Sequence, residues 1–138
     1  MEYFDLPEEK TFLISQKALI VEGASLLILK NTADKWGQKV QWELPGGTLE
    51  VDEGLKKSLK REVLEETDLT ISIGEPIAVW TYWLRGFEFK DGRRLDAKAV
   101  VIAYLCKKEK GKIRLSDEHS NYRWATKDEL RTLEFARN

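Results

Sequence analysis

Residues 47–69 decide how this chain folds, and in one-letter code they read GTLEVDEGLKKSLKREVLEETDL. Aliphatic side chains recur there at four-residue intervals, at Leu55, Leu59 and Val63. This spacing is typical of the apolar stripe of a helix, so we predict a helix over residues 53–67. At about 100° per residue, Glu62 and Glu66 fall on the same side as the aliphatic residues. An ordinary surface helix does not carry carboxylates there.

The carboxylates of this predicted helix are also crowded at its unfavourable end. Glu62, Glu65 and Glu66 repel one another at neighbouring helical positions. The partial negative charge of a helix C-terminus opposes them further. A bound cation would relieve both effects. At the other end, Asp52 is expected to cap the helix and Glu53 to suit its first turn.

The same residues resemble the signature of the Nudix hydrolases. That signature runs Gly, five residues, Glu, seven residues, Arg-Glu-aliphatic-any-Glu-Glu-any-Gly-aliphatic, and the chain matches it except at the second Gly, where Asp68 stands. The usual Gly ends the helix in the left-handed conformation. Asp tolerates that conformation better than most residues, so we expect a left-handed Asp68.

The resemblance implies an α/β fold, the Nudix-type α/β/α sandwich with a mixed β-sheet and a catalytic loop–helix–loop. It also implies a divalent cofactor, Mg²⁺ with Mn²⁺ as a substitute. The implied metal ligands are the carbonyl of Gly46 and the carboxylates of Glu62, Glu65 and Glu66. Hard oxygen ligands of this kind suit Mg²⁺, which would lower the pKa of an attacking water.

Further catalytic roles follow from the resemblance. Glu53 matches a glutamate that assists metal or water binding, and Arg61 matches an arginine that orients the glutamates by ion pairing. A purely structural role fits both residues equally well. Glu118 lies in a stretch similar to a second family loop and is a candidate metal ligand or general base. Glu65 and Glu66 are equal candidates for the base, because geometry decides before pKa does.

Contacts to the rest of the substrate are predicted from side-chain chemistry. Gly47 lets the backbone approach a ligand closely. Lys30 and Arg85 lie near the ends of predicted strands and could hold phosphates, and Trp36 in a polar loop could stack on a base. His119, the only histidine, is expected to form hydrogen bonds rather than bind metal.

The substrate class remains open at this stage. Family members acting on ADP-ribose or dinucleoside polyphosphates often carry a Pro or Tyr about 15 to 18 residues after the signature, whereas Pro76 and Tyr82 lie too close to it. This favours a MutT-like nucleoside triphosphate pyrophosphatase. The alternatives are an ADP-ribose, nucleotide-sugar or dinucleoside polyphosphate pyrophosphatase, and a non-catalytic nucleotide-sensing module. Isomerisation of an isoprenoid diphosphate would need reactive residues beyond Cys106.

The rest of the chain predicts strands around this helix. Segments rich in aliphatic, β-branched or aromatic residues are 11–22, 24–30, 40–44, 77–89, 95–107 and 122–125. Hairpins are expected at Glu22-Gly23 and Asp91-Gly92. Pro45-Gly46-Gly47 should stop a strand, Gly74-Glu75-Pro76 should form a turn, and Thr126 should open a final helix with a capping box. This order favours a mixed sheet between helices.

Composition fits one domain over residues 1–138. A chain of 138 residues has the usual size of a single domain. Its formal net charge of −1 gives no argument for a nucleic acid polymer or a membrane surface as partner. The single cysteine, the lack of a long apolar run and the absence of a signal-peptide pattern point to the cytoplasm. A small-molecule nucleotide is the expected partner, with a homodimer expected only by analogy with the family.

Overall fold

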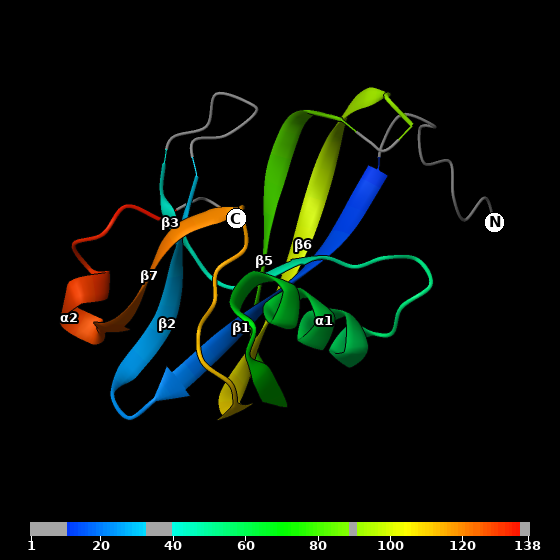
Figure 1. Ribbon diagram of the computed structural model, residues 1–138. Helices are drawn as coiled ribbons and strands as arrows, with labels where there is room; N and C mark the ends of the chain where they lie inside the picture. Colours follow the sequence, from blue (N-terminus) through cyan, green and yellow to red (C-terminus); the bar gives the residue numbers. More distant parts are fainter. Residues whose placement is uncertain (1–10, 33–39, 89–90, 136–138) are drawn as a thin grey trace.

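Strand β1 (Thr11–Glu22) joins two parts of a mixed sheet (Figure 1). The computed structural model describes residues 11–32, 40–88 and 91–135. Most of β1 runs parallel to β6 (Arg94–Lys110), while its last two residues pair antiparallel with β2 (Ser25–Asn31). The hairpin predicted at Glu22-Gly23 is therefore confirmed, although it is short.

The second part of the sheet is built on β2. Strand β7 (His119–Thr126) pairs antiparallel with β2 along nearly its whole length, and β3 (Trp42–Glu43) pairs with the end of β2. Both neighbours were expected as strands, but β3 is shorter than the predicted segment 40–44 and β7 begins earlier than residue 122. The pairing brings β3 and β7 to the same end of β2, where the candidate site lies.

Strand β5 (Thr70–Glu88) forms the antiparallel hairpin with β6 that was expected across Asp91-Gly92. The turn predicted at residues 74–76 is wrong, because β5 continues through it. The register shifts on both sides of Pro76 and absorbs the extra residues as irregularities of the ladder. Gly74 allows this close pairing, since a Cβ there would lie 2.8 Å from the carbonyl oxygen of Leu105.

Helix α1 (Leu55–Thr67) packs on the sheet and closes the core (Figure 1). The buried residues of this core are Ala18, Ile20, Leu27, Leu29, Leu59, Val63, Leu69, Ile71, Tyr104 and Cys106. Three expectations about the helix start are wrong. The helix begins at Leu55 and not at residue 53, so Glu53 lies before the first turn, and Gly54, not Asp52, is the N-cap. Leu55, expected in the apolar stripe, is 41% exposed. At the other end, Asp68 has φ 63° and is left-handed, as predicted.

The glycines after Pro45 form a strand instead of a plain turn. Strand β4 (Gly46–Thr48) pairs with the middle of β1. Gly46 has φ +139°, and a Cβ there would lie 2.0 Å from the carbonyl oxygen of Gln16. Only glycine fits this conformation and this close approach. The pairing fixes the glycine backbone beside α1.

A short helix, α2 (Lys127–Leu130), follows β7. The predicted capping box is present: Thr126 Oγ1 accepts from the amide of Glu129 at 3.4 Å and donates to its carboxylate at 3.1 Å. Leu130 and Leu133 are half-buried. Within the described ranges, no helix is long and apolar enough to cross a bilayer.

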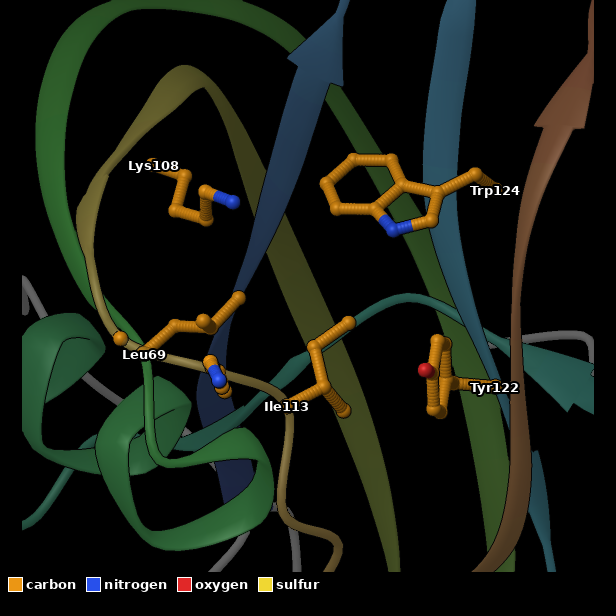
Figure 2. A pocket seen from close by; sticks show the side chains of 7 residues that line it. Leu69, Lys108, Ile113, Tyr122 and Trp124 are labelled. Carbon is orange, nitrogen blue, oxygen red and sulfur yellow. The ribbon is translucent and has the colours of Figure 1, made fainter.

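A cavity of about 400 Å³ lies beyond the end of α1 (Figure 2). Tyr122 and Trp124 of β7 line one side, and Leu69, Lys108 and Ile113 are among the residues on the other. None of the carboxylates of residues 47–69 lines it. The cavity is therefore separate from the site predicted from the sequence.

Candidate active site

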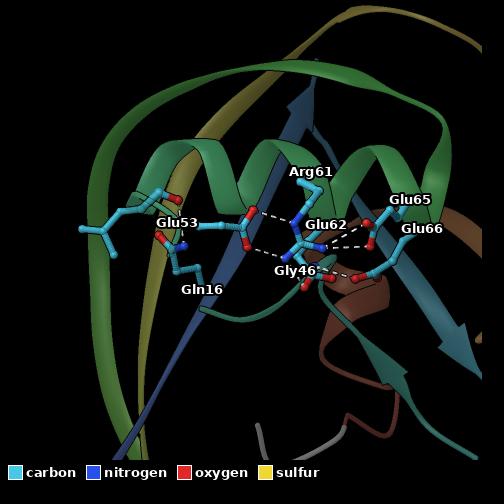
Figure 3. Close-up of polar contacts among 8 residues, drawn as sticks. Gln16, Gly46, Glu53, Arg61, Glu62, Glu65 and Glu66 are labelled. Carbon is cyan, nitrogen blue, oxygen red and sulfur yellow. Dashed lines mark hydrogen bonds and ion pairs between the residues drawn. The ribbon is translucent and has the colours of Figure 1, made fainter. Parts of the chain in front are cut away.

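The last turns of α1 bring two carboxylates against the glycine backbone of β4 (Figure 3). Glu66 is 4% exposed, and its Oε1 lies 3.3 Å from the amide nitrogen of Gly46. The Glu62 side chain is 19% exposed, and a Cβ on Gly47 would lie 2.7 Å from its carboxyl carbon. Glycine at position 47 therefore leaves the space that the Glu62 carboxylate occupies. The inward placement expected for both glutamates is confirmed.

Arg61 contacts three carboxylates of the same segment (Figure 3). Its Nε and Nη2 donate to the two oxygens of Glu53 at 2.6 and 2.7 Å, the fork geometry that makes such pairs strong. Its Nη1 lies 3.0 and 3.1 Å from the oxygens of Glu65, and Nη2 lies 3.1 Å from Oε1 of Glu62. The predicted pair with Glu65 is present. Arg61 thus ties the loop before α1 to the middle of the helix.

The buried end of α1 carries excess negative charge. Burial raises the pKa of Glu66 well above its ordinary value, because the charged form loses hydration. Lys17 opposes this effect, while the nearby carboxylates of Glu43, Glu62 and Glu118 raise the pKa of Glu66 further. Burial also raises the pKa of Glu62, against the opposing effect of the adjacent guanidinium. The local field therefore favours the approach of a cation.

Two buried polar residues of β1 contact backbone segments around the site and were not predicted from the sequence. Gln16 is fully buried, and its Nε2 donates to the carbonyl oxygen of Leu55 at 2.8 Å. Lys17 is 5% exposed, and its Nζ lies 3.4 Å from the carbonyl oxygen of Leu44. The available signal was the run of polar residues at positions 15–17 between the apolar segments of this strand. Buried polar groups of this kind need partners, and backbone carbonyl oxygens serve as hydrogen-bond acceptors for both side chains.

His119 is enclosed between two carboxylates from different elements. Its Nε2 lies 2.6 Å from Oε1 of Glu43 on β3, and its Nδ1 lies 3.7 Å from Oε2 of Glu66 on α1. The hydrogen-bonding role expected for His119 is confirmed by the contact with Glu43. Glu43 itself was missed, because an acidic residue in a short predicted strand gives no signal of its own.

The remaining predicted residues are distributed more widely. Glu118 is exposed, and its charge reaches both buried glutamates of α1. Lys30 lies on β2 with its Nζ 5.8 Å from the ring centre of Trp42, next to the pairing of β2 with β3. The contacts of Arg85 lie within the β5–β6 hairpin: its Nη1 is 2.9 Å from Asp96 Oδ2. Trp36 lies outside the described residues.

The carboxylates at the end of α1 provide part of what a divalent cation requires. Glu62 and Glu66 offer carboxylate oxygens in a partly dehydrated setting, and hard oxygen donors suit Mg²⁺. Among the described side chains, no three or more His, Cys, Asp or Glu groups already converge in a metal-binding arrangement. Glu53 and Glu65 are instead directed to Arg61. The residues fit a divalent cation chemically, and Glu65 would join it only by leaving Arg61.

Comparison with known proteins identifies the family of this chain. The NUDIX domain family matches residues 14–138. A MutT-like protein of Streptomyces ambofaciens is 30% identical over 93% of this chain and 75% of its own length. The nucleoside triphosphatase NudI of Escherichia coli is 26% identical over 81% of this chain and 80% of its own length.

A solved structure also resembles this chain in fold and sequence. The crystal structure of a MutT protein from Methanosarcina mazei superposes with a TM-score of 0.69 at 29% identity, covering 91% of this chain and 85% of that one. The chain therefore belongs to the NUDIX family, with its mixed sheet and signature helix. It is a Nudix hydrolase. The fold, the family and the enzyme class implied by the sequence are thus confirmed.

Proposed function

We propose that this enzyme is a Mg²⁺-dependent nucleoside triphosphate pyrophosphatase of the MutT-like kind. The observation that carries the proposal is the pair of inward carboxylates, Glu62 and Glu66, set against the Gly46–Gly47 backbone in a field of excess negative charge. The names of two relatives, a MutT-like protein and a nucleoside triphosphatase, support a triphosphate as the substrate. The cytoplasm remains the compartment that this function would require.

In this proposal the acidic end of α1 holds the cation and the reacting diphosphate. The ligands are the carboxylates of Glu62 and Glu66, with Glu65 and the carbonyl of Gly46 completing the protein's share. When bound, Mg²⁺ neutralises charge on the phosphate oxygens and lowers the pKa of the attacking water. A carboxylate of Glu65, Glu66 or Glu118 accepts the proton of that water. The water oxygen then bonds to phosphorus while the anhydride bond opposite opens.

Other residues position these groups. Arg61 restrains Glu53 and Glu65 through the contacts described above. Gly47 leaves room for Glu62 and for close approach of the substrate. Lys30, beside β3, and Arg85 are the proposed phosphate contacts, although the guanidinium of Arg85 would have to leave Asp96 to serve.

A substrate panel tests the function. Purified enzyme with Mg²⁺ would be incubated with nucleoside triphosphates, ADP-ribose, nucleotide sugars and dinucleoside polyphosphates, and released pyrophosphate and orthophosphate would be measured. We expect release from at least one nucleoside triphosphate, with the highest kcat/KM in that group. A preference for ADP-ribose or a nucleotide sugar would overturn the substrate assignment. No turnover of any of them would favour the non-catalytic module.

A pair of variants tests the role of the site. Glu66→Gln removes one buried carboxylate charge, and we expect kcat to fall about 100-fold or more, as when metal sites lose a key group. Glu109→Gln is the matched control, because Glu109 is exposed on β6 and lies outside the proposed site. Full turnover by the Glu66 variant would reject its assignment as a ligand.

A further inference from the structure

In the buried imidazole of His119, one ring nitrogen contacts a carboxylate and the other has no hydrogen-bond partner among the described residues. Its side chain is 2% exposed. Nε2 makes the short 2.6 Å contact with Glu43 Oε1, so the ring orientation is fixed from β3. Among the described residues, Nδ1 has no hydrogen-bond partner. Leaving such a buried polar atom without a hydrogen-bond partner is unfavourable.

The group that Nδ1 faces is Glu66. Its Oε2 lies 3.7 Å from Nδ1, and the Glu66 side chain is 5% exposed. A movement of about 0.5 Å would bring the two atoms within hydrogen-bonding distance. The chain therefore places an unused donor position beside a carboxylate of the proposed metal site.

The two neighbours of Glu66 act on different oxygens. The Gly46 amide lies at Oε1 and His119 Nδ1 lies at Oε2. With a donor at each oxygen, the carboxylate plane is fixed, and each oxygen still has a second lone pair for a ligand. A carboxylate restrained in this way meets a cation in one orientation.

We propose that His119 is a positioning residue that donates from Nδ1–H to Oε2 of Glu66, with Glu43 holding the ring. The inference rests on the proposed function, because it takes Glu66 to be a metal ligand. In this arrangement a hydrogen also lies between Nε2 and Oε1 of Glu43, because each hydrogen bond requires one. Groups that orient metal ligands are typically worth about 10- to 100-fold in metal affinity.

Two amide substitutions separate the two ring nitrogens. In His119→Asn the amide reaches the position of Nδ1 and can still donate to Glu66. In His119→Gln it reaches the position of Nε2 and serves only Glu43. Mn²⁺ affinity would be measured by calorimetry and by paramagnetic resonance of free Mn²⁺, without nucleotide, beside the melting temperature of each protein.

We expect the Gln variant to bind Mn²⁺ about tenfold more weakly than the wild type, and the Asn variant to stay within about threefold of it. If the His119→Gln variant binds Mn²⁺ as tightly as the wild type, the inference about His119 is overturned and the proposed function stands. Equal losses of Mn²⁺ affinity in the two variants, at equal melting temperatures, would have the same consequence. If neither variant folds, Glu43→Ala decides: a similar loss supports the role of the ring, and unchanged affinity overturns it. Absence of Mn²⁺ binding by the wild type would overturn the proposed function, and the inference with it.

Discussion

The left-handed residue at the end of α1 offers a test of how this sequence departs from its family. Asp68 has φ 63° and ψ 18°, and its amide donates to the carbonyl oxygen of Leu64 at 2.9 Å. The last turn of α1 carries no basic residue that would balance the carboxylate. We predict that Asp68→Gly stabilises the protein while activity is retained, because residue 68 shapes the helix end and not the chemistry.

The magnitude follows from three effects. A left-handed conformation costs an L-residue about 1–2 kcal/mol, with Asp near the lower end. Removing a negative charge from a helix C-terminus gains about 0.3–1 kcal/mol. The added freedom of glycine in the unfolded chain removes about 0.4–1 kcal/mol. The net gain is about 1 kcal/mol.

This gain converts into a temperature shift. With 138 residues and an unfolding entropy of about 2.1 cal/mol/K per residue, 1 kcal/mol raises the melting temperature by roughly 3 °C. Differential scanning calorimetry at low ionic strength, without metal or nucleotide, measures it. Asp68→Asn is the matched control, because it removes the charge and keeps the tolerance for positive φ, and it should gain only the dipole part. A melting temperature of Asp68→Gly clearly below that of the wild type would refute the reasoning.

Three further predictions concern the glycines, a buried carboxylate and the core. Gly46→Ala should prevent stable folding, because its Cβ would lie 2.0 Å from a backbone oxygen of β1. Gly47→Ala should fold but bind Mn²⁺ more weakly, because its Cβ would displace the Glu62 carboxylate. Circular dichroism measures the folding of each variant, and calorimetry measures its Mn²⁺ affinity. Burial raises the pKa of Glu66 above 4.5, so the metal-free wild type should lose stability as the pH rises through that raised pKa. Glu66→Gln should therefore resist urea better than the wild type at pH 7 and equally well at pH 4. A Glu66→Gln variant less stable than the wild type at pH 7 would contradict this. Leu59→Ala, at a site with no exposure, should lower the unfolding free energy by about 2–5 kcal/mol, and Leu64→Ala, at a site 49% exposed, by under about 1 kcal/mol in the same urea experiment.

Local patterns predicted the parts of the fold that local forces determine. The apolar stripe through Leu59 and Val63 predicted the helix, and Asp91-Gly92 predicted the long hairpin. The left-handed Asp68 followed from the family pattern and the chemistry of Asp. In each case, neighbours in sequence impose the conformation.

Pairing between distant segments was not predictable in the same way. Residues 46–48 became a strand because β1 offers them hydrogen bonds, and residues 74–76 stayed in β5 because β6 continues beside them. The helix begins at Leu55 with Gly54 as its N-cap, and the Glu53 carboxylate just before it contacts Arg61. A turn signal or a capping residue states a local preference, and tertiary contacts overrode it in each of these places.

The candidate site, like the fold, was predictable where neighbours in sequence determine it and not where distant segments meet. The spacing of the signature placed Glu62 and Glu66 on the inner side of α1. It could not indicate that Glu43 and His119, which are 76 positions apart, meet beside Glu66. That meeting depends on β3 and β7 pairing with the same end of β2. Because β3 and β7 meet only by pairing with β2, no spacing of residues in the sequence indicates their contact.

Strand β5 pairs with β6 alone among the described strands, so its outer margin presents unpaired amides and carbonyls. Among the residues of this strand whose burial is described, the exposed large hydrophobic side chains are Ile77, Val79 and Trp83. A long, regular edge strand of this kind would allow strands of other chains to pair with it and build fibrils. The shifts around Pro76 and near residue 84 break it into short stretches, and the proline contributes no amide hydrogen. The irregularities of this strand thus leave only short regular stretches with which a strand of another chain could pair.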